Sequence, residues 1–192
     1  LPPGFGAGDL EWPSPERIAF GPLTNFGYEG SVLLRAPLHV PQELVPGATV
    51  DVRAQAKWLV CDRDECIPGT APLSLTLPVG AAPPPPTSAL PLFDAARARR
   101  PVAVPTGWAL TATASPERIT IVAQGVAAAV APPPVYFPFG RETIEHAAPQ
   151  TLTLTSDGFR LGLTPWSGAT APPTTLAGVL TVGGRAYTVD MR

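Results

Sequence analysis

The sequence predicts an all-β protein made of two β-sandwich-like units that a proline-rich linker joins. Three observations predict this fold class. Apolar and polar residues alternate with a period of two in several short segments, Pro and Gly separate those segments, and no segment shows the period of a long amphipathic helix. With 192 residues, 45% of them hydrophobic, the chain is long enough for one large domain or two small ones.

The first half contains the clearest strands. Residues 49–60 alternate apolar and polar side chains throughout, as a half-buried antiparallel strand does. Residues 73–79 repeat the pattern, and residues 31–40 are a third, less regular candidate. Pro37 interrupts that third segment, which favours an edge or a bulge at its end.

Four consecutive prolines, Pro83–Pro86, mark the centre of the chain. Consecutive prolines cannot join a sheet ladder and favour an extended, semi-rigid spacer. We therefore expect a first domain over residues 1–82, a linker over 83–91 and a second domain over 92–192. Residues 92–100, rich in Ala and Arg, predict a short helix at the start of the second domain.

The second half again predicts strands. Residues 108–113 and 119–121 alternate, and residues 152–163 and 179–189 each form two alternating runs around a short turn. The turns contain Asp-Gly and Gly-Gly, which are strong hairpin signals between alternating runs. The second domain is therefore expected to be a β-sandwich as well.

Composition excludes several function classes. A charged fraction of 15% and a net charge of -2 exclude a polybasic nucleic-acid binder and an acidic tail. No apolar run reaches the length of a membrane helix, so we expect no membrane insertion by this segment. The only histidines, His39 and His146, lie far from any other candidate ligand in the sequence, so we expect no zinc site.

The two cysteines, Cys61 and Cys66, are the most informative local feature. They follow one predicted strand and precede the next, so they can face each other at a hairpin tip, where opposed Cα atoms lie about 4.5–5.5 Å apart. A disulfide spans about 4.4–6.8 Å, so the pair can be bridged there. Closing so short a ring contributes only about 2 kcal/mol by loop entropy, which favours a redox role over a structural one. A structural disulfide, free thiols and a Cu(I) site through two thiolates stay open as alternatives.

Acidic residues surround these cysteines. Asp62, Asp64 and Glu65 against Arg63 give the loop a formal charge of -2. Negative neighbours disfavour a thiolate and raise the pKa of a cysteine thiol. We therefore expect these three acids to tune the thiols and to make the couple an electron donor.

Four blocks of residues resemble the periplasmic amino-terminal domain of the DsbD family of membrane thiol-disulfide transporters, and above all its ScsB-like branch (suppressor of copper sensitivity). The blocks are Trp58–Cys61 with Cys66–Gly69, Leu73–Val79, Glu11–Arg17 and Phe26–Gly30. They cover about residues 1–80. In the second half, residues 136–138 and 146–150 are similar to the second periplasmic unit of the same branch.

The resemblance implies an immunoglobulin-like fold in the periplasm, as a domain of an inner-membrane protein. It implies that Cys61 and Cys66 form the redox pair. The spacing does not assign which of the two attacks the client, and we favour Cys66. Electrons would arrive through transmembrane and thioredoxin-like domains of the same protein and leave to oxidised periplasmic thioredoxin-fold proteins. No cofactor is implied, because the cysteines carry the electrons, and a link to copper tolerance comes from the branch name alone.

The resemblance also implies a cap loop over the cysteines at Phe26, Gly27, Tyr28, Glu29 and Gly30. Aromatic rings can cover a disulfide, and glycines let such a loop move. The alternative is an aromatic turn that packs on the sandwich.

The chain departs from the family pattern in two places. Family members usually carry further strands before the Leu1-Pro2-Pro3 stretch, so either the first sandwich lacks them or they precede the sequence. The loop between the cysteines is also longer and more acidic than the branch's common form, which bears on potential and partner choice. Two other functions stay open: an immunoglobulin-like periplasmic binding or assembly module with a structural disulfide, and a copper-binding domain.

Overall fold

A computed structural model describes residues 1–62, 65–127 and 131–192. The regular secondary structure in these ranges is almost entirely β-strand, with fourteen strands and one short helix, which confirms the predicted all-β class. Its contacts divide it into two units. Unit 1 comprises Leu1–Glu11 and Leu33–Ala96, and unit 2 comprises Trp12–Val32 and Arg97–Arg192.

This division differs from the domain boundary expected at residues 83–91. Residues 12–32 were expected in the first domain, but their contacts group them with residues 97–192. The physical reason is that these residues form a hairpin whose apolar and hydrogen-bonding side chains pack on the second half of the chain. The proline-rich stretch itself forms neither helix nor strand between Pro83 and Pro86.

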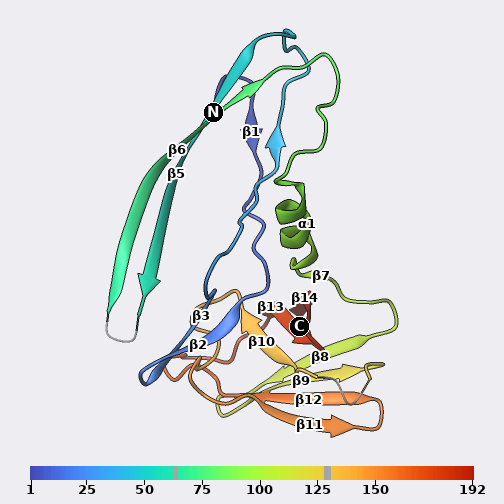
Figure 1. The fold of residues 1–192 in the computed structure, drawn as a ribbon. Helices are drawn as coiled ribbons and strands as arrows, with labels where there is room; N and C mark the ends of the chain where they lie inside the picture. The colour runs from blue at the N-terminus through green and yellow to red at the C-terminus, as the bar shows by residue number, and fades with distance from the viewer. Residues whose placement is uncertain (63–64, 128–130) are drawn as a thin grey trace. The chain divides into compact units, whose positions relative to one another are not determined.

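Unit 1 is built from paired strands and the helix. Strands β1 (Gly6–Ala7) and β4 (Leu38–His39) form a short antiparallel ladder. Strands β5 (Thr49–Cys61) and β6 (Cys66–Pro78) form a long antiparallel hairpin (Figure 1). Helix α1 (Leu90–Ala98) forms close to the predicted position, with Pro91 in its first turn, where no backbone donor is needed.

The register of β5 and β6 separates their side chains into two faces. One face is apolar along its whole length, and its residues are Val50, Val52, Ala54, Ala56, Trp58 and Val60 opposite Leu77, Leu75, Leu73, Ala71, Gly69 and Ile67. The other face is mostly polar and carries the two cysteines at the tip. Many apolar side chains of the first face stay accessible, with Val60 59% and Leu75 57% exposed.

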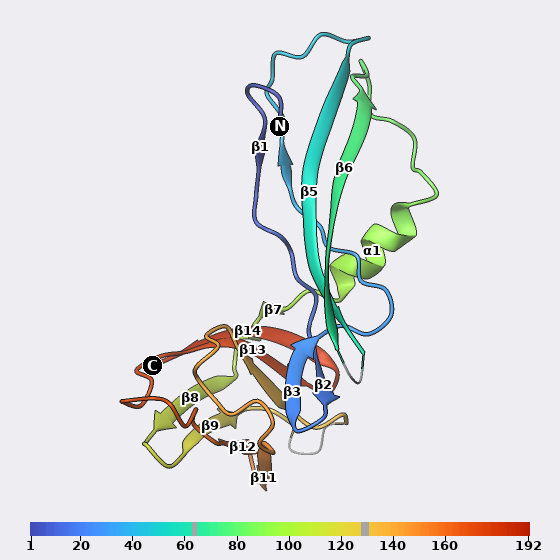
Figure 2. The same cartoon turned by 90° about the vertical axis from the view of Figure 1, so that its left-hand side faces the viewer.

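Unit 2 is a sandwich of two four-stranded sheets (Figure 2). The first sheet has the order β10–β13–β14–β7 and the second has the order β11–β12–β9–β8. Their bounds are β7 (Val102–Ala103), β8 (Ala109–Ala114), β9 (Ile119–Gln124), β10 (Val135–Pro138), β11 (Thr151–Thr155), β12 (Gly158–Leu163), β13 (Leu176–Val182) and β14 (Arg185–Met191). The two hairpins predicted in this half are confirmed as β11–β12 and β13–β14.

The hydrophobic core of the described residues lies between these two sheets. Ile121 of β9, Phe159 of β12 and Leu180 of β13 are fully buried there. Alternation along each strand brings one set of side chains into this layer, as expected for packed sheets. Gly183 and Gly184 form the β13–β14 turn, and both have positive φ (58° and 78°). A two-residue hairpin turn whose twist matches that of the strands requires positive φ at such positions.

A further hairpin of unit 2 was not predicted. Strands β2 (Glu16–Phe20) and β3 (Leu23–Gly27) pair in antiparallel register. Phe26 packs against a small buried cluster of Phe137, Val179 and Ala186. In contrast, the third candidate strand over residues 31–40 shortens to the two residues of β4, directly after Pro37. No helix in the described part of the chain is long and apolar enough to cross a membrane.

Candidate active site

A disulfide lies at the tip of the β5–β6 hairpin. Cys61 is the last residue of β5 and Cys66 is the first of β6, and the two are direct partners in the register. Their Cα atoms are 4.0 Å apart and their sulfurs are bonded. The predicted opposition of the two cysteines is therefore confirmed. Both residues are exposed.

Backbone and side-chain hydrogen bonds close the tip beyond the disulfide. The Asp62 amide donates to the Glu65 carbonyl oxygen at 3.0 Å, and the Glu65 amide donates to Asp62 Oδ1 at 2.9 Å. Asp62 thus shapes the turn through its side chain, a role of Asp that is common in tight turns and that the sequence analysis did not foresee. Of the three acids expected to tune the thiols, Asp62 and Glu65 directly adjoin the cysteines. Asp64 lies outside the described residues.

Apolar side chains follow the disulfide along both faces of the hairpin. On the face of the cysteines, the neighbouring pair is Leu59 opposite Pro68, and Leu59 is 62% exposed. On the other face, the Trp58 indole occupies the space above Gly69, where a Cβ atom would collide with the ring. Gly69 is therefore required by the position of the indole.

The segment expected to cap the disulfide belongs to unit 2. Phe26 makes an edge contact with Phe137, with ring centroids 5.1 Å apart, and stacks on His146 at 4.2 Å. Such aromatic pairs stabilise beyond the area they bury. The contacts of the Phe26 ring therefore agree with the alternative expectation, which is that this segment packs on the sandwich.

The rest of the segment comprises Tyr28, which contacts other residues of unit 2, and the neighbouring residues Gly27, Glu29 and Gly30. The Tyr28 hydroxyl donates to the Pro13 carbonyl oxygen at 2.9 Å, and its ring is stacked with Trp12 at 6.3 Å. Burial raises the pKa of Tyr28, while the Arg99 charge acts to lower it. Gly27 is half-buried, whereas Glu29 and Gly30 are exposed, and Gly30 has a φ of 69°.

Hydrogen bonds of Arg17, which the sequence did not predict, anchor the β2–β3 hairpin to the rest of unit 2. The Arg17 guanidinium donates to the carbonyl oxygens of His146 at 2.6 Å and Ala148 at 2.9 Å. Partial burial lowers the pKa of the His146 imidazole; the Glu145 charge opposes this shift and the Arg17 charge adds to it. His39, the other histidine, lies in β4 of unit 1. Within the described ranges, no three His, Cys, Asp or Glu side chains gather as a metal site would need.

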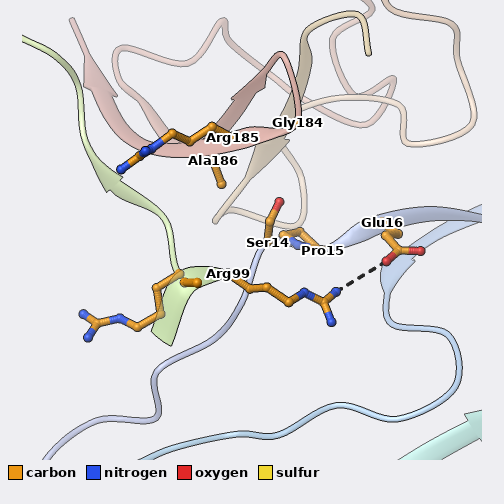
Figure 3. A pocket seen from close by; sticks show the side chains of 9 residues that line it. Ser14, Pro15, Glu16, Arg99, Gly184, Arg185 and Ala186 are labelled. Carbon is orange, nitrogen blue, oxygen red and sulfur yellow. Dashed lines mark ion pairs between the residues drawn. The ribbon is translucent and has the colours of Figure 1, made fainter. Parts of the chain in front are cut away.

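Unit 2 also has a surface pocket of about 330 Å³ between residues 14–16, 98–100 and 184–186 (Figure 3). An ion pair joins Arg99 to Glu16 across 3.6 Å. The Arg185 side chain extends away from that pair. Arg99 and Arg185 thus do not converge on one point, and the disulfide is the group with clear chemistry among the described residues.

Comparison with known proteins supports the same site. Residues 1–78 match the family model described as the N-terminal part of the thiol:disulfide interchange protein DsbD, a range that contains both cysteines. This confirms the resemblance stated for the first part of the chain. The structure is similar to the crystal structure of the N-terminal periplasmic domain of ScsB from Proteus mirabilis, with a TM-score of 0.65 and 18% identity. That similarity covers 97% of this chain and 74% of the solved one. No curated protein sequence matches the chain.

Proposed function

We propose that this chain is a periplasmic thiol-disulfide exchange module of a larger membrane protein of the DsbD/ScsB type. In this proposal, the Cys61–Cys66 couple passes electrons to oxidised thioredoxin-fold proteins of the periplasm. The observation that carries the proposal is an exposed disulfide at the tip of a hairpin that lies within the matched family range. An oxidising compartment such as the periplasm is also where a disulfide persists.

The proposed chemistry is a balanced two-electron exchange. A cysteine thiolate attacks one sulfur of the client disulfide, which forms a mixed disulfide and releases one client thiol. The second cysteine then attacks the mixed disulfide, so that Cys61–Cys66 is oxidised and the client becomes a dithiol. The thioredoxin-like and transmembrane domains of the same protein would return the pair to the reduced form, and no organic cofactor takes part.

Cys66 is the proposed attacking thiol. Cys61→Ala should then accumulate a mixed disulfide with an oxidised thioredoxin-fold client, because the resolving thiol is gone. Cys66→Ala should give much less. Equal trapping by both variants would contradict this assignment.

Asp62, Asp64 and Glu65 are proposed to tune the reduced pair. A negative charge beside a sulfur destabilises the thiolate and raises the pKa of the thiol. The reduced dithiol is then less favoured relative to the disulfide, so the couple is a better electron donor. A pH titration of thiol alkylation tests this, because Glu65→Gln should lower the apparent thiol pKa.

The segment Phe26–Gly30 is proposed to shield the disulfide from stray thiols. Its residues Glu29 and Gly30 are accessible, and Gly30 has no Cβ atom to restrict a change of backbone conformation in this loop. Tyr28→Ala should then speed reduction of the disulfide by small thiols. An unchanged rate would leave the segment with its packing role alone.

The decisive experiment is the reduction potential of the Cys61–Cys66 couple, measured by equilibration with dithiothreitol or glutathione and thiol trapping. A potential of about -200 to -270 mV, in the range of thioredoxins and glutaredoxins, would support the proposal. A potential below about -300 mV is typical of structural disulfides and would favour an immunoglobulin-like binding or assembly module instead. Titration of the reduced protein with Cu(I) would show whether the pair binds copper.

A further inference from the structure

The face of the β5–β6 hairpin that carries the disulfide changes character over a short distance. At the tip, Asp62 directly follows Cys61 and Glu65 directly precedes Cys66, so two acidic residues adjoin the cysteines in the chain. Behind the disulfide lies the exposed apolar pair of Leu59 and Pro68. The next pair on this face contains Lys57, the only lysine of the chain. A docking partner therefore meets negative charge, then the disulfide, then apolar surface, then positive charge.

We propose that this face selects its redox partners by charge, and that the partner carries a basic group beside its reactive cysteine and apolar surface next to it. The inference rests on the proposed function and specifies the partner of the same site. A partner thiolate must approach the sulfurs within contact distance, so the acidic tip repels an anionic partner unless a basic group offsets that charge. Leu59 and Pro68 offer the surface on which an apolar rim can be buried.

The size of the effect follows from the distances along the hairpin. Glu65 is the immediate neighbour of Cys66, and consecutive Cα atoms are about 3.8 Å apart, so its charge lies within roughly 7 Å of an attacking thiol. In water, one unit charge at that distance changes the local concentration of a singly charged reactant roughly threefold at low salt. The change disappears at high ionic strength, where the Debye length falls to about 3 Å. Asp62 acts in the same direction.

The test compares small thiols of different charge on the oxidised protein. The probes are cysteamine, which is cationic, 2-mercaptoethanol, which is neutral, and 2-mercaptoethanesulfonate, which is anionic. For each probe, the rate at which it reduces the Glu65→Gln variant is divided by the rate at which it reduces the wild type, so that the probe's own reactivity cancels. At low salt, we expect this ratio to be roughly threefold lower for cysteamine, and roughly threefold higher for the sulfonate, than the ratio for 2-mercaptoethanol. At high salt, we expect the three ratios to be equal.

Asp51→Asn is the matched control. It removes the same charge from the same face of β5, but Asp51 lies about 34 Å along the strand from Cys61, beyond the reach of screened electrostatics. Asn can still accept the hydrogen bond that Thr76 Oγ1 donates to Asp51 Oδ1 at 2.6 Å. The control should therefore leave all three ratios at one.

The outcomes separate this inference from the proposed function. If the neutral thiol opens the disulfide and Glu65→Gln changes all three probes in equal proportion, the acid acts only on the thiol pKa and charge selection is wrong. If Asp51→Asn gives the same pattern as Glu65→Gln, the selection is not local to the tip and the inference is also wrong. If none of the three thiols opens the wild-type disulfide, the proposed function fails first, and charge selection fails with it.

Discussion

Phe26→Ala separates the packing role of this ring from the proposed shielding role of its segment. Phe26 is half-buried and contacts both Phe137 and His146. Truncation of a fully buried Phe costs about 3–5 kcal/mol, and an aromatic pair adds about 0.5–1.5 kcal/mol. Halving the sum of these values for a half-buried ring with two ring contacts, we expect the free energy of unfolding of unit 2 to fall by about 2–4 kcal/mol.

Urea denaturation followed by tryptophan fluorescence measures this loss. The control is Phe139→Ala, because Phe139 is also in unit 2 but is 64% exposed, so its loss should change stability by less than about 0.5 kcal/mol. The rate at which a small thiol reduces Cys61–Cys66 is measured in parallel on the folded variants. Unchanged stability of Phe26→Ala would refute the packing argument, and a faster thiol reaction at unchanged stability would assign the ring to the shield.

Three further outcomes are expected. Gly69→Ala should displace the Trp58 indole and cost the hairpin about 1 kcal/mol, seen as a shifted indole N–H resonance of Trp58; an unmoved resonance would contradict the steric argument. Arg17→Met removes both hydrogen bonds to the carbonyl oxygens of His146 and Ala148 and should destabilise unit 2 by about 2–3 kcal/mol in urea; a loss below about 0.5 kcal/mol would show that water replaces them. Because burial lowers the pKa of folded His146, the unfolded chain binds its proton first, so stability should decline as the pH falls below about 6.5 and level off below the folded pKa; His146→Gln should flatten this part of the profile.

The sequence was sufficient for elements whose apolar pattern is local. The long alternation over residues 49–60 predicts β5, and the spacing of Cys61 and Cys66 predicts the tip that joins it to β6. Both are confirmed, because a hairpin is determined by neighbouring residues and a short turn. The same holds for β13–β14, where Gly183 and Gly184 supply the turn.

The β2–β3 hairpin could not be found in this way. Its strands have five residues each and little regular alternation, and their stabilising contacts are remote in sequence. Phe26 packs on Phe137, and Arg17 reaches the carbonyl oxygen of His146, which is 129 residues away. The alternation of apolar and polar residues within a short segment does not identify partners so far away in the sequence. At the candidate active site, the cysteine pair could be predicted from the sequence, whereas the turn-forming hydrogen bond to Asp62 Oδ1 could not.

The order of the units along the chain has a consequence for synthesis. Residues 12–32 belong to unit 2, but the body of unit 1 is inserted before the remainder of unit 2 begins at residue 97. During synthesis the amino-terminal part of the chain is made first. Strands β2 and β3 can therefore reach contacts such as that of Arg17 with His146 only after more than a hundred further residues have been made, and this separation slows folding. The β5–β6 hairpin pairs two segments that are adjacent in the chain, so it can form, and its cysteines can meet an oxidant, while unit 2 is still incomplete.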